Sequence, residues 1–135
     1  MIPEAYVSFE IAKLLKEKGF DENTLMVYMS YGDLCKCNRY DSIRNSNYND
    51  ITKNYFECTA PTHQMTMAWL REIHNIHIEI YVIKNYDKKI CEYTYTIMDL
   101  NFPGSDDGID CCNEYKTYEQ ACESAIKYCL ERLVW

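Results

Sequence analysis

The stretch Cys58–Val82, CTAPTHQMTMAWLREIHNIHIEIYV, decides the fold because it reads as a helix that runs directly into a strand. Its apolar residues Met65, Trp69 and Ile73 repeat every four positions, the spacing of one face of a helix. After Asn75 the period changes to two, which is typical of a half-buried strand. Helix stripe and strand face each need a covering surface, and each is the nearest partner for the other.

The ends of this central helix carry their own signals. We expect Thr59 to cap its first turn through the side-chain hydroxyl, with Pro61 in that turn, where a missing N–H costs nothing. Asn75 is expected to stop the helix. Met67 falls between the two histidines of the helix, so the spacing places it on the flank of the stripe. Trp69 is expected at the centre of the core.

Working outward, the chain offers two more helices and three more strands. Ser8 caps a helix over 9–18 that Gly19 ends, and Thr117 with Gln120 forms a capping box for the last helix. Strands are expected over 24–31, 51–58 and 90–98, and residues 85–89 form a hairpin turn after the strand that begins at Ile76. Residues 35–50 and 101–114 are expected to be loops, the first anchored by Ile43.

The predicted fold class is therefore α+β, in the order α-β-β-α-β-β-α. We expect a small antiparallel sheet of about four strands with three helices packed on one face. A chain of 135 residues is expected to form a single domain. Trp69, the aliphatic face of the strand and the apolar stripes of the other two helices would then share one core.

The composition of the chain excludes some classes of function. The net charge of −7 argues against a sequence-independent grip on nucleic acid, which needs a basic footprint. No apolar run is long enough to span a membrane, and no signal peptide is visible at the N-terminus, so we expect a cytoplasmic protein. In that compartment the 8 cysteines are expected to be reduced, with Cys122 and Cys129 acting as small core residues.

Candidate chemical groups do not form a recognised catalytic motif. Cys58 precedes the central helix and His63 lies one turn into it, but a structural thiol is the better interpretation. Zinc sites usually carry a two-residue spacer between cysteines, which the pairs Cys35-x-Cys37 and Cys111-Cys112 lack. The acidic cluster formed by Asp106, Asp107 and Asp110 lacks the spacing of a calcium loop. We therefore predict no enzyme activity, no metal and no cofactor.

Three segments carry a resemblance. The sequences IPEAYVSFEIAKLLKEKGFDE (2–22), CTAPTHQMTMAWLREIHNIHIEI (58–80) and YKTYEQACESAIKYCLERL (115–133) resemble small uncharacterised proteins encoded by phages and prophages of gut Bacteroidetes. Residues 33–54 and 101–114 lie outside this resemblance. It implies a phage-associated accessory protein inside the bacterial host, and it assigns a role to no residue.

The remaining candidate is a binding surface on the sheet face away from the helices. We expect it to display Tyr28, His77, Glu79, Tyr81, Thr94 and Thr96. Tyrosine combines apolar area with a polar tip, as protein interfaces favour, although these residues are also good strand formers in any solvated sheet. The sequence favours a non-enzymatic module that binds a host or phage protein. The alternative is a binder of a nucleotide-like small molecule, whose base would stack on the tyrosines.

Overall fold

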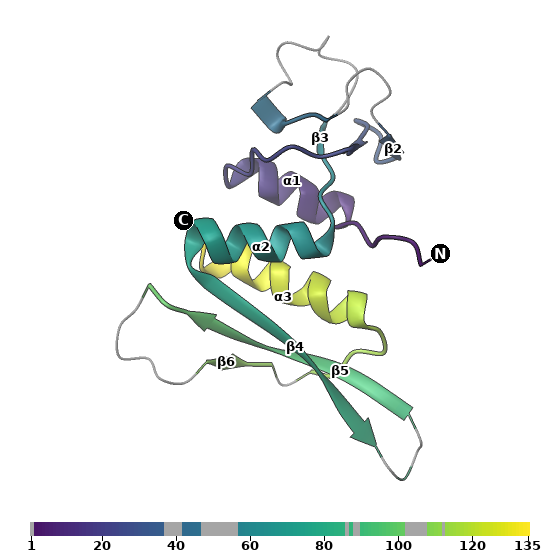
Figure 1. The fold of residues 1–135 in the computed structure, drawn as a ribbon, viewed down its shortest axis with the longest axis vertical. Helices are drawn as coiled ribbons and strands as arrows, with labels where there is room; N and C mark the ends of the chain where they lie inside the picture. The colour runs from purple at the N-terminus through teal and green to yellow at the C-terminus, as the bar shows by residue number, and fades with distance from the viewer. Residues whose placement is uncertain are drawn as a thin grey trace. The chain divides into compact units, whose positions relative to one another are not determined.

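The computed structural model describes residues 2–36, 42–46, 57–85, 87, 90–101, 108–111 and 113–135. These residues form an α+β fold with three helices and two antiparallel sheets of three strands (Figure 1). The chain divides into two compact units, Met1–Thr62 and His63–Trp135. That the chain forms a single domain remains a prediction from its length.

The first unit begins with helix α1, Phe9–Glu17. Its ends follow the sequence signals: the Ser8 hydroxyl accepts a hydrogen bond from the Ile11 backbone N–H, and Gly19 has a φ of 93° just after the C-cap. Only glycine adopts that left-handed conformation without strain. The predicted apolar stripe was Ile11, Leu14 and Leu15; the helix buries Ile11 and Leu15 together with Ala12, and Leu14 is half-buried.

The sheet of the first unit has the order β2-β1-β3, with β1 at Met26–Tyr28, β2 at Leu34–Lys36 and β3 at Cys58–Thr59. Val27 of β1 and Ile43 form a buried cluster, which confirms Ile43 as the anchor of its segment. The strand predicted over 24–31 is shorter than expected, and β2 was not predicted. Most of the strand expected over 51–58 lies outside the described residues.

The second unit begins with helix α2, His63–His74, so the predicted N-terminus was wrong. Thr59 belongs to β3, because it pairs with Val27 across the first sheet, and Pro61 precedes the helix. The predicted C-terminal stop is confirmed: Asn75 has a φ of 56°, a left-handed conformation that asparagine tolerates better than most residues.

The buried side of α2 also differs from the predicted stripe. It consists of His63, Thr66, Met67, Trp69 and Leu70, whereas Met65 and Ile73 are exposed. Trp69 is buried as expected, but it lies at the margin of the buried side, and Met67 is in the core and not on the flank. The apolar spacing located the helix correctly and misjudged its rotation, because threonine and histidine occupy core positions here.

Two long strands, β4 at Ile76–Asn85 and β5 at Ile90–Asp99, form the predicted hairpin with an unbroken antiparallel register. A short strand, β6 at Ile109–Asp110, adds to β5 within the segment predicted to be a loop. Helix α2 packs on β4, and helix α3, Tyr118–Arg132, packs on both β4 and β5. The two helices therefore cover the aliphatic face of the sheet except at Val82, which is exposed.

Helix α3 begins at the predicted capping box with one difference. The Thr117 hydroxyl accepts from the Gln120 backbone N–H at 3.1 Å, as in a standard box. The Gln120 side chain accepts from the Lys116 backbone N–H, one residue before the cap. Cys122 and Cys129 are fully buried, which confirms them as core residues.

The predicted sheet of about four strands under three helices is therefore corrected to two sheets. Helix α1 packs with β3 in the first unit, and among the described helices α2 and α3 cover the sheet of the second. The element order also gains β2 and β6, which pair through short segments.

Candidate binding surface

The register of β4 and β5 places most of the predicted binding residues on one face of the second sheet. His77 lies opposite Met98, Glu79 opposite Thr96, and Tyr81 opposite Thr94. Directly opposed side chains in an antiparallel pair lie about 4.5–5.5 Å apart at Cβ. Alternation along each strand turns these residues away from the face that α2 and α3 cover. We call this set, His77, Glu79, Tyr81, Thr94, Thr96 and Met98, the open face.

Tyr28 does not belong to the open face, and its prediction as part of the same surface was wrong. It lies in β1 of the first unit, where its side chain is buried. Its hydroxyl donates to the Val7 backbone carbonyl, and its ring lies 5.3 Å from the ring of Phe9, centroid to centroid. Tyr28 is therefore a core residue whose polar tip is satisfied internally.

The two threonines of the open face are held by neighbouring segments. The Thr94 hydroxyl is buried and donates to the Asn113 backbone carbonyl at 2.9 Å. The Thr96 hydroxyl donates to the Asp110 carboxylate, also at 2.9 Å. The exposed part of the open face therefore consists of His77, Glu79, Tyr81 and Met98.

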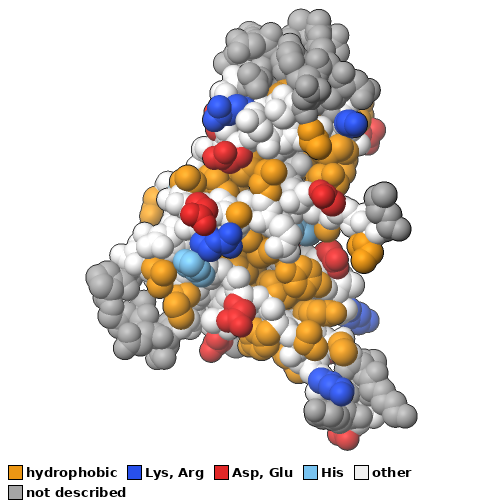
Figure 2. All heavy atoms as spheres, viewed as in Figure 1, with side chains coloured by type: hydrophobic (Ala, Val, Ile, Leu, Met, Phe, Trp, Pro, Cys, Tyr) orange, Lys and Arg blue, Asp and Glu red, His pale blue; other side chains and the backbone are white. Residues whose placement is uncertain are grey.

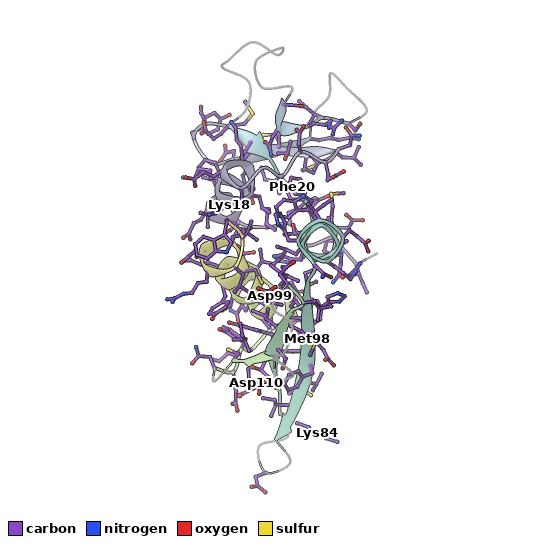
Figure 3. The ribbon with its side chains drawn as sticks, turned by 90° about the vertical axis from the view of Figure 1, so that its left-hand side faces the viewer. Lys18, Phe20, Lys84, Met98, Asp99 and Asp110 are labelled. Atoms are coloured by element: carbon purple, nitrogen blue, oxygen red, sulfur yellow. The ribbon has the colours of Figure 1, made fainter. Side chains whose placement is uncertain are left out.

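Sequence reasoning missed Met98, although the strand alternation that selected Thr94 and Thr96 also selects it. Met98 is exposed beside His77, and it adds a flexible apolar side chain to a surface that was expected to be polar and aromatic. Figure 3 labels Met98 on β5 and Asp110 on β6.

Strand β6 limits the open face on the side of β5. Gly108 precedes it, and a Cβ at that position would lie 2.7 Å from Cγ2 of Thr96 and 3.1 Å from the Ile97 carbonyl oxygen. Both distances are shorter than ordinary contacts, so glycine permits the chain to approach β5 this closely. The exposed part of the open face is therefore centred on β4 and the end of β5.

Cys58 and His63, the candidate catalytic pair, each have a structural role. Burial raises the pKa of the Cys58 thiol to about 12, so the thiolate that a nucleophile requires is strongly disfavoured. His63 Nε2 lies 2.7 Å from a carboxylate oxygen of Glu123 on α3, which ties the start of α2 to its neighbouring helix. The other ring nitrogen, Nδ1, is buried without a hydrogen-bond partner among the described residues.

The candidate zinc cysteines are described only in part. Cys35 lies in β2 and Cys111 follows β6, whereas Cys37 and Cys112 lie outside the described residues. In the part of the chain that the structure describes, no three His, Cys, Asp or Glu side chains gather as metal ligands would. Although burial opposes charge on Cys111, hydrogen bonds from the Asn113 backbone N–H and from Tyr95 lower the pKa of its thiol.

Comparison with protein-family models, with curated proteins and with solved structures found no match. Among the helices that the structure describes, none has the length and apolar character needed to cross a membrane.

Proposed function

We propose that this chain is a non-enzymatic protein-interaction module, a phage-associated accessory protein that acts in the cytoplasm of a bacterial host. The observation that carries the proposal is the open face, where Tyr81, Met98, His77 and Glu79 are exposed together on paired strands. An aromatic and a thioether side chain next to one acid and one imidazole suit a protein surface of mixed polarity.

The open face suits a protein better than a nucleotide-like molecule. The two threonine hydroxyls, whose donors a small ligand would otherwise use, already donate to Asn113 and Asp110. Arg71, a candidate cation for a phosphate, bonds the carboxylate of Glu72. An extended, partly apolar surface with its internal hydroxyls satisfied favours contact with a macromolecule.

The test is affinity capture from host lysate with a matched pair of variants. Met98→Glu places a charge on the open face, whereas Leu34→Glu makes the same kind of change at a similarly exposed position in the first unit. We expect wild type and Leu34→Glu to recover the same protein, and Met98→Glu to lose most of it. Recovery of no specific protein, or equal recovery by both variants, would count against the proposal. A thermal shift with a nucleotide panel would favour the small-molecule alternative.

A further inference from the structure

Strand β4 forms one edge of the second sheet, whose order is β4-β5-β6. Its residues pair with β5 without interruption from Ile76, opposite Asp99, to Asn85, opposite Ile90. Among the described residues no strand pairs with the other side of β4, and at about 3.4 Å per residue this open edge is about 34 Å long. The backbone along such an edge is a template for adding another antiparallel strand.

Natural sheets usually protect long edges, and β4 carries two charged side chains but neither a proline nor a bulge. Proline, a β-bulge, a very short strand or charges pointing inward would each discourage pairing with another chain. The sequence of β4, IHIEIYVIKN, contains no proline, and its register with β5 contains no bulge. Its charged residues, Glu79 and Lys84, are of opposite sign, so the strand adds no net charge in a chain of net charge −7.

Apolar side chains are exposed both on β4 and on the helix that packs on it. In the strand, Val82 and Tyr81 are exposed. In the helix layer, α2 exposes Met65 and Ile73, and α2 is the helix that packs on β4. Figure 3 shows α2 and β4 on one side of this unit with α3 and β6 on the other, and Figure 2 shows hydrophobic side chains gathered over the region of β4 and β5.

We propose that the open edge of β4 is a homodimer interface, in which two copies of this chain pair their β4 strands antiparallel and join their sheets. A two-fold axis perpendicular to the sheet at Ile80 would pair residues 76–84 of the two copies. Ile78 would then face Val82 of the second copy, and Glu79 would face Tyr81. No like charges lie opposite each other in this register, and like charges directly opposed would destabilise it.

A second copy supplies both a strand and the helix packed on it, whereas an unrelated extended peptide supplies only the strand. The two-fold axis keeps the helix-covered faces of the copies on the same side of the joined sheet. The aliphatic residues of β4 therefore continue one covered layer, and the α2 helices of the two copies become neighbours. Isologous pairing of this kind needs only one self-complementary surface, which is why two-fold dimers are the commonest oligomers.

Sedimentation velocity over a range of concentrations tests the proposal. We expect the mass to rise from 16.1 kDa toward twice that value as concentration increases. Val82→Lys places a charge in the paired edge and should weaken the dimer at least tenfold. Leu25→Lys is the matched control, because it changes the charge equally at a residue that is 57% exposed, against 55% for Val82, in the first unit.

Hydrogen exchange on the wild-type chain tests the same proposal without a variant, so misfolding of a variant cannot affect the result. The amides of β4 should exchange more slowly in the concentrated dimer than after dilution, whereas those of α1 should not change. A monomer at every concentration, or a dimer that Val82→Lys leaves intact, would overturn the proposal. So would protection of β4 only on addition of a different protein. Met98→Glu lies on β5, so loss of partner capture and loss of the dimer are separable results.

Discussion

Trp69 and Trp135 give a matched test of the core at the scale of single residues. Trp69 is 6% exposed on α2, whereas Trp135 is 96% exposed at the C-terminus. Truncation of a buried tryptophan to alanine typically costs about 3–5 kcal/mol of the free energy of unfolding. We expect Trp69→Ala to show a loss of this size in urea denaturation followed by circular dichroism, and Trp135→Ala to denature like the parent. Equal midpoints for both variants would contradict the burial of Trp69.

The buried thiols predict how stability depends on pH. Burial raises the pKa of Cys58 and of Cys129 to about 12, from an ordinary value of about 9. Above pH 9 the unfolded chain loses these protons while the folded chain keeps them. The free energy of unfolding should therefore fall as pH rises from about 9 to about 12. Below pH 9 both states keep these protons, so the two thiols do not make the stability depend on pH.

Urea midpoints at pH 8 and pH 10.5 check this dependence. Tyrosine and lysine also titrate in that range, so the comparison needs a variant that removes one thiol. Cys129→Ala should lower the midpoint at pH 8 and reduce its further fall at pH 10.5. Cys91→Ala, at an exposed position, should keep the parent's full dependence. A fall that is the same in all three proteins would show that buried thiols do not contribute to it.

At the scale of secondary-structure elements, the rotation of α2 is open to a direct test. Met67 is 8% exposed and Met65 is 37% exposed, although the apolar spacing predicted the reverse. Removal of a buried methionine side chain typically costs about 2–5 kcal/mol. We expect Met67→Ala to lower the free energy of unfolding by an amount in that range and Met65→Ala to lower it clearly less. The opposite order would restore the predicted stripe.

The approach of β6 to β5 gives a second prediction for an element. Gly108→Ala would force its Cβ against the methyl group of Thr96 and should cost about 1–3 kcal/mol, as overpacking does. Thr96→Ser removes that methyl group, so the double variant should recover part of the loss. Thermal denaturation of the two single variants and the double variant measures the coupling. Simple additivity of the two effects would mean that the contact is absent.

Elements with a local signal could be predicted from the sequence, and those held only by distant partners could not. Ser8, Gly19, Asn75 and Thr117 mark helix ends through hydrogen bonds or backbone conformations within a few residues, so their prediction succeeded. Strands β2 and β6 exist because β1 and β5 pair with them, and their own sequences carry no alternation long enough to detect. Thr59 was misassigned for the same reason, since a cap residue and a strand residue look alike until the pairing is known.

At the scale of the whole molecule, the sequence predicted α+β but not the partition of the strands. The alternating pattern of a strand predicts that one of its faces is covered, but it does not predict which element covers that face. The open face shows the same limit. His77, Glu79, Tyr81, Thr94 and Thr96 were grouped correctly because they lie on two paired strands that follow each other closely in the sequence. Tyr28 was grouped wrongly because its sheet depends on pairing with Cys58, far along the chain.

Paired strands lie close together in the sequence in the second sheet and far apart in the first, and this difference has a consequence for the order of folding. Asn85 and Ile90 pair with only four residues between them in the sequence, whereas Tyr28 must pair with Cys58 across a much longer stretch of chain. Closing a longer loop costs more chain entropy, and non-local pairing slows folding. We therefore expect pulse-labelled hydrogen exchange during refolding to protect the amides of β4 and β5 before those of β1. Simultaneous protection of both sheets would contradict this order, and if it holds, the edge that β4 exposes is present while the first unit is still unfolded.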